Sequence, residues 1–167
     1  AIRRYRRVLE KVPEVDGTWY NLGQCHLELG ELEEAGRAFA EARERNPHSL
    51  AYLRDLALVR VNTGKPEAAL GLIREGLGRR PGDFHLLSLL FEAHLANGSP
   101  GQARALEDQL IANQPESGAP EYRMARLYHK YDHFREALRL ARGAAGKAPE
   151  DPAYTQWLDS LKEQKDD

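Results

Sequence analysis

The chain has 167 residues, 41% of them hydrophobic and 30% charged, with a formal net charge of -2. No apolar run approaches the ~20 residues that cross a membrane, and the near-neutral charge gives no overall attraction to nucleic acid or to an anionic membrane. We therefore expect a soluble protein with no nucleic acid and no membrane as partner. Cys25 is the single cysteine, which excludes an internal disulfide. Cysteine content therefore does not indicate the compartment, and both the cytoplasm and the periplasm are compatible with the sequence.

Two residue types recur at intervals of 34 along the chain. Proline recurs at Pro13, Pro47, Pro81, Pro115 and Pro149, and alanine at Ala1, Ala35, Ala69, Ala103 and Ala137. Two residue types that keep the same 34-residue interval along the whole chain indicate a tandem repeat. Because the first residues lie inside a repeat and carry no methionine or leader, we expect a fragment or a processed chain.

Residues 1–12 predict one amphipathic helix, the second helix of a pair that lacks its first. Its apolar face is formed by Ile2, Tyr5, Val8, Leu9 and Val12, and its other face by Arg3, Arg4, Arg6, Arg7 and Lys11. A basic solvated face is a commoner feature of helices than a nucleic-acid patch, and we favour the former.

From Asp16 the pattern predicts further helices, which make ten with the first. Their approximate ranges are 16–29, 32–45, 50–63, 66–79, 84–97, 100–113, 118–131, 134–147 and 152–165. Gly30, Gly64 and Gly98 recur at the turn within pairs, where positive φ ends a helix, and Asp132 takes that place in the fourth pair. Asp83 and Asp151 are placed to cap the helices that follow them.

The recurring residues resemble the tetratricopeptide repeat (TPR) family, whose 34-residue pattern is most complete between Trp19 and Pro47. That copy contains Trp19, Leu22, Gly23, Gly30, Ala35, Phe39, Ala42 and Pro47. The resemblance implies an all-α, right-handed superhelical solenoid of antiparallel helix pairs. We expect a partial repeat over 1–15, repeats over 16–49, 50–83, 84–117 and 118–151, and a C-terminal capping helix over 152–167.

Small residues are predicted to let paired helices approach closely, at Gly23 with Ala35 and at Ala57 with Ala69. The third repeat departs from this pattern. Phe91 occupies a position that is small in the other repeats, and Glu107 occupies one that is apolar in the other repeats. The crossing of its two helices is therefore expected to be opened or rotated. The second helices of repeats two and four contain glycines and are expected to be less stable than the others. These glycines are Gly71, Gly76, Gly78, Gly143 and Gly146.

We expect no enzymatic activity, no cofactor and no metal. His129 and His133 stand four residues apart near Asp132, a spacing that suits a metal on one continuous helix, but the repeat predicts a helix end between them. His26 and His94 share a packing column and are predicted to be half-buried core residues. Cys25 is predicted to be a small buried hydrophobe, with no histidine assignable as a base.

In the family that the sequence resembles, the first helix of each pair lines a concave groove that binds a peptide segment or helix of a partner. The groove positions correspond to Tyr20, Gln24, Leu27, Glu28, Arg54, Asp55, Leu58, Val61, His85, Ser88, Leu89, Glu92, Leu95, Tyr122, Arg123, Arg126, His129 and Lys130. Because Arg123, Arg126 and Lys130 gather at the end of this set, a ligand with an acidic stretch should prefer the fourth repeat.

The sequence argues against two other functions and leaves a third open. The clamp of chaperone-binding members of the family needs lysines, asparagines and an arginine, whereas the matching columns hold Tyr20, Gln24, Asp55, His85 and Leu89. Acidic residues in repeats one to three argue against RNA. The main alternative to a peptide-binding scaffold is a structural array that mediates oligomerisation, with self-association through residues 1–12.

Overall fold

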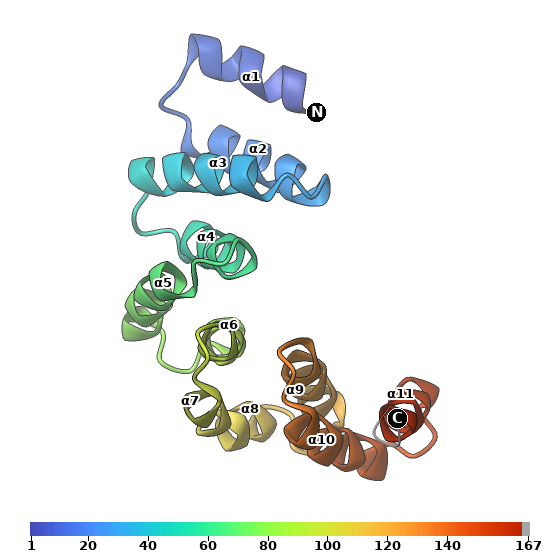
Figure 1. Cartoon of the computed structure of the whole chain (residues 1–167). Coiled ribbons are helices and arrows are strands. Elements are labelled where there is room, and N and C mark those ends of the chain that lie inside the picture. The colour runs from blue at the N-terminus through green and yellow to red at the C-terminus, as the bar shows by residue number, and fades with distance from the viewer. Residues whose placement is uncertain (165–167) are drawn as a thin grey trace. The chain divides into compact units, whose positions relative to one another are not determined.

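The computed structural model describes residues 1–164, and every regular element in that range is an α-helix (Figure 1). The helices are α1 Ile2–Lys11, α2 Asp16–Glu28, α3 Leu32–Arg45, α4 Leu50–Asn62, α5 Pro66–Arg79, α6 Phe84–Ala96, α7 Pro100–Arg104, α8 Glu107–Ala112, α9 Ala119–Lys130, α10 Phe134–Lys147 and α11 Pro152–Glu163. They form two compact units, unit 1 over Ala1–Asn97 and unit 2 over Gly98–Asp167. None of the described helices is long and apolar enough to cross a bilayer.

Unit 1 contains α1 to α6, and helices that follow each other in the chain pack against each other (Figure 1). The α2–α3 pair closes over Gly23, where a Cβ atom would lie 2.5 Å from a ring carbon of Phe39. The sequence predicted a small residue at this crossing, and the contact with Phe39 leaves no room for a Cβ atom there. Successive clusters of buried apolar side chains continue the core, with Phe39 and Val59 in one and Ile73 in the next.

The predicted turns and caps are confirmed. Gly30, Gly64, Gly98 and Asp132 all have positive φ, between 63° and 74°. Asp83 accepts a hydrogen bond from the backbone of Leu86, and Asp151 accepts one from Ala153. These residues satisfy backbone groups that a helix end leaves without partners.

In unit 2, α8 contacts α9, and α10 packs against both α9 and α11. The predicted helix over 100–113 is wrong in one respect, since it is divided into α7 and α8 at Ala105 and Leu106. Glu107, which stands in the apolar column, is only 6% exposed and lies between two polar partners. It accepts hydrogen bonds from the hydroxyl of Tyr128 at 2.8 Å and the guanidinium of Arg139 at 2.5 Å.

A set of polar contacts recurs with the 34-residue period at the prolines that end the repeats. A basic side chain near the end of a second helix donates to the carbonyl oxygen of the proline that ended the previous repeat. The bonds join Arg45 to Pro13 (2.8 Å), Arg79 to Pro47 (2.9 Å) and Lys147 to Pro115 (2.6 Å). In the third repeat Asn113 holds this position and donates to Gln109 of its own helix.

Candidate functional site

The five residues predicted for the fourth repeat line one cavity of about 610 Å³ in unit 2. All five lie on α9, and α11 contributes Trp157 to the same wall. The lining residues are Ala119, Tyr122, Arg123, Arg126, Leu127, His129, Lys130 and Trp157. A cavity of this size lies within the range that is typical of ligand sites.

Helical spacing explains why these side chains share one face of α9. Met124, Ala125 and Tyr128 are buried, whereas Arg126 and Lys130, one turn apart, are exposed. The buried face fixes the rotation of the helix, and the cations are therefore held at the mouth of the cavity.

Aromatic rings form the wall of the cavity. The Tyr122 ring lies 4.8 Å from that of Tyr154 and meets Trp157 edge to face at 5.4 Å between centroids. The guanidinium of Arg126 lies 5.9 Å from the Tyr122 centroid, within the range of a cation–π contact. His129 lies 6.1 Å from Trp157, and its Nε2 is 3.1 Å from Oε1 of Gln164. The site thus combines an apolar aromatic wall with permanent positive charge.

The predicted residues of unit 1 are arranged differently, because they bond to one another. Asp55 is only 8% exposed and accepts hydrogen bonds from the Tyr20 hydroxyl at 2.7 Å and the Gln24 amide at 2.6 Å. Arg54 adds a third contact at 3.3 Å. Burial, followed by the bond to Asp55, raises the pKa of Tyr20. These polar groups are satisfied within the fold.

The remaining predicted positions divide between surface and core. Glu28 and His85 are exposed, Ser88 and Glu92 are half-buried, and Leu27 and Leu58 pack against core clusters. Three predictions are wrong, because the side chains are buried apolar residues that cannot face a groove. These are Val61, Leu89 and Leu95.

Sequence reasoning missed Trp157 and the tyrosine pairs. It predicted only a capping helix over 152–167 and no site residue there, although Trp157 lines the cavity. A signal was present, since Tyr20 and Tyr52 have the same separation as Tyr122 and Tyr154. Equal separations at equivalent positions of a repeat indicate equivalent contacts.

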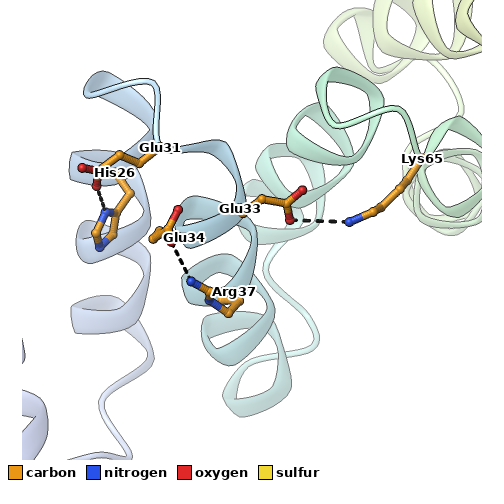
Figure 2. Close-up of polar contacts among 6 residues, drawn as sticks. All are labelled: His26, Glu31, Glu33, Glu34, Arg37 and Lys65. Atoms are coloured by element: carbon orange, nitrogen blue, oxygen red, sulfur yellow. Dashed lines mark hydrogen bonds and ion pairs between the residues drawn. The ribbon is translucent and has the colours of Figure 1, made fainter.

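Figure 2 shows three separate polar pairs around the start of α3, and one of them contains His26, a histidine that the sequence assigned to packing. Nδ1 of His26 lies 2.5 Å from Oε2 of Glu31. His26 and His94 are both buried, which is deeper than the half-burial predicted for them. Glu34 accepts from Arg37, and Glu33 pairs with Lys65 at 3.5 Å. The Glu34–Arg37 and Glu33–Lys65 pairs are exposed to solvent, and exposed ion pairs contribute little to the stability of a fold.

Two further predictions have mixed outcomes. Cys25 is partly exposed, so the prediction that it is a buried residue is wrong. A helix end does separate His129 from His133, because α9 ends at Lys130 and His133 is the N-cap of α10. Within residues 1–164, no three His, Cys, Asp or Glu side chains are grouped so that they could hold a metal ion.

Comparison with known proteins agrees with this architecture. The tetratricopeptide repeat family model matches residues 1–49 and 54–118, and the chain belongs to that family. TPR proteins are in general scaffolds for protein interaction. No curated protein sequence matches the chain significantly.

Solved structures share the fold at low sequence identity. The chain is similar to YrrB, described as a TPR protein with an unusual peptide-binding site, at 16% identity and a TM-score of 0.71, covering 93% of this chain and 80% of that one. TTC0263, a thermophilic TPR protein of Thermus thermophilus, has 21% identity, a TM-score of 0.71 and coverages of 96% and 88%. A structure of MamA has 17% identity, a TM-score of 0.74 and coverages of 93% and 85%.

Proposed function

We propose that the chain is a non-catalytic scaffold that binds a peptide segment or helix of a partner protein, and that the cavity between α9 and α11 is its principal site. The ligand has an acidic stretch. The supporting observation is the convergence of Arg123, Arg126 and Lys130 on one aromatic-walled cavity. Attraction between this rim and an acidic segment raises the association rate and selects against basic ligands.

Unit 1 supports the same choice of site. The side chains of Tyr20, Gln24 and Asp55 already satisfy one another, and a ligand that used them would have to break these bonds. Breaking a buried hydrogen bond without replacing it is costly. The cavity of unit 2 requires no such exchange at Arg126, which is exposed and contacts the face of Tyr122.

The test is binding of a fluorescein-labelled, glutamate-rich peptide over a series of salt concentrations. Replacing both Arg126 and Lys130 with Glu should weaken binding and flatten its salt dependence. The control carries the same charge change on α10, outside the residues that line the cavity, as Arg135→Glu with Arg142→Glu. Equal loss in the two variants, or unchanged binding in the first, would reject this site.

Self-association through residues 1–12 is the second candidate, and it has one observation in its favour. Val8 and Val12 of this segment are 44% and 48% exposed. Burial of such side chains between two copies would stabilise an assembly. Light scattering over a range of concentrations tests it: a mass that increases with concentration and returns to that of a monomer in Val8→Glu supports assembly, and a constant monomer mass rejects it.

A further inference from the structure

Two places in the chain, three repeats apart, contain the same tyrosine pair. In unit 1, Tyr20 of α2 and Tyr52 of α4 have ring centroids 4.7 Å apart at an interplanar angle of 31°. In unit 2, Tyr122 of α9 and Tyr154 of α11 have centroids 4.8 Å apart at 43°. Each residue of the second pair follows its counterpart by three 34-residue repeats. The two pairs are therefore equivalent, and the residues around them can be compared position by position.

Two neighbours of the tyrosine pair differ between these places. Asp55 of unit 1 corresponds to Trp157 of unit 2, and Gln24 corresponds to Arg126. In unit 1 the Asp55 carboxylate accepts from Gln24 and from the tyrosine hydroxyl, so the fold supplies its own anion. In unit 2, Trp157 replaces the acidic side chain of Asp55. The guanidinium of Arg126 replaces the neutral amide of Gln24.

Tyr122 and Arg126 of unit 2 line a cavity, whereas their counterparts in unit 1, Tyr20 and Gln24, bond to a carboxylate. Within residues 1–164 the hydroxyl of Tyr122 has no hydrogen-bond partner, and no Asp or Glu is among the described residues that line the cavity. The buried acidic residues described in unit 2, Glu107 and Glu121, form ion pairs with Arg139 and Lys147. A hydroxyl and a permanent cation at an open cavity favour an anionic acceptor from outside.

We propose that this cavity binds an aspartate or glutamate side chain of the partner's peptide. The Tyr122 hydroxyl and the Arg126 guanidinium hold its carboxylate, as Tyr20 and Gln24 hold Asp55. Trp157 packs against an apolar residue of the peptide that is adjacent to the acidic one. The cavity has room for both residues, because it is larger than one carboxylate requires, and aromatic rings form its wall. The inference rests on the proposed function, to which it adds the recognised unit: one acidic residue next to one apolar residue.

The experiment uses the whole chain and two short synthetic peptides with blocked ends. One contains a leucine flanked by glutamates, and the other has glutamine at each glutamate position. Fluorescence anisotropy should show at least about tenfold tighter binding of the glutamate peptide, which is the scale expected for hydrogen bonds to a charged group. Equal affinities for the two peptides would overturn the proposal.

Two substitutions at one position separate the loss of the ring from the gain of charge. Trp157→Asp installs in unit 2 the carboxylate that unit 1 has, and it should compete internally and abolish the preference for glutamate. Trp157→Asn removes the same ring without adding charge, and it should weaken both peptides while keeping the preference. Thermal unfolding followed by circular dichroism verifies that both variants fold. An equal effect of the two substitutions would contradict the proposal.

The outcomes also distinguish this inference from the proposed function. If the glutamine peptide binds as tightly as the glutamate peptide, and the Arg126→Glu, Lys130→Glu variant loses both, the cavity remains the interaction site, whereas the carboxylate assignment and the acidic character of the ligand both fail. If neither peptide binds, or if that variant binds both like the unchanged chain, the proposed site fails as well.

Discussion

The hydroxyl of Tyr128 donates a 2.8 Å hydrogen bond to the buried carboxylate of Glu107, at a position where other repeats have an apolar side chain. Burial, the hydrogen bond to Glu107 and its charge all raise the pKa of Tyr128, so the hydroxyl keeps its proton. The polar pair connects α8 to α9 in the unit where the expected helix over 100–113 is divided.

Tyr128→Phe should lower the free energy of unfolding of unit 2 by about 1.5 to 3 kcal/mol, because a buried carboxylate loses a donor. Urea denaturation measures the change. The control is Tyr154→Phe, which removes the same atom from a half-buried tyrosine that has no hydrogen bond within the described residues. An equal effect of the two substitutions would show that the Glu107 bond contributes nothing.

Two glycines of α5 should respond to alanine in opposite directions. A Cβ atom at Gly76 would lie 2.7 Å from a methyl carbon of Leu86, whereas one at Gly78 would meet nothing within 4 Å. Gly76→Ala should therefore destabilise unit 1 by ~1 to 3 kcal/mol through overpacking. Gly78→Ala should stabilise it by up to ~1 kcal/mol through helix propensity. Thermal melts of the two variants should shift with opposite signs, and a stabilising Gly76→Ala would contradict the predicted clash.

His94 should make the stability of unit 1 depend on pH. Burial, and then the charge of Arg74, lower the pKa of His94 below its ordinary value of 6.5. The unfolded chain therefore binds a proton more readily than the folded one, and stability that is complete above pH 6.5 is lost as the pH falls toward the folded pKa. Urea denaturation at about pH 7.5 and about pH 5.5 measures the loss.

His94→Gln should reduce this loss, because glutamine does not titrate, whereas His48→Gln at an exposed position should leave it unchanged. The prediction fails if the unchanged chain and the His94→Gln variant lose the same stability between the two pH values.

Arg79 should stabilise the junction between two repeats. Its guanidinium donates to the Pro47 carbonyl and to Glu75. Arg79→Met keeps much of the apolar stem and should cost about 0.5 to 1.5 kcal/mol, the usual contribution of a hydrogen bond. The neighbouring Arg80→Met, at an exposed position, is the control for the change in charge. Equal unfolding midpoints for the two variants would remove the assigned role.

The sequence was sufficient for features that depend on residues close together in the chain. The turns at Gly30 and Asp132 follow from conformational freedom at a helix end, and the cap at Asp83 follows from its position before an apolar run. These are local properties, and the 34-residue period repeats them.

Features that depend on partners distant in the chain were not predicted. The burial of Glu107 requires Tyr128 and Arg139, which lie on two other helices. The role of Trp157 likewise depends on α9 being packed so that Tyr122 faces it. Burial of a single helical position is set by the helices beside it, and a periodic pattern gives only the average environment of its column.

The bonds from Arg45, Arg79 and Lys147 all end on main-chain carbonyl oxygens. Every amino acid presents such an oxygen, so the donor needs no particular side chain on the neighbouring repeat. At this contact, repeats could be duplicated, deleted or exchanged without a compensating substitution. The side chains that distinguish one repeat from another, such as Asp55 and Trp157, are then free to diverge on a junction that stays interchangeable.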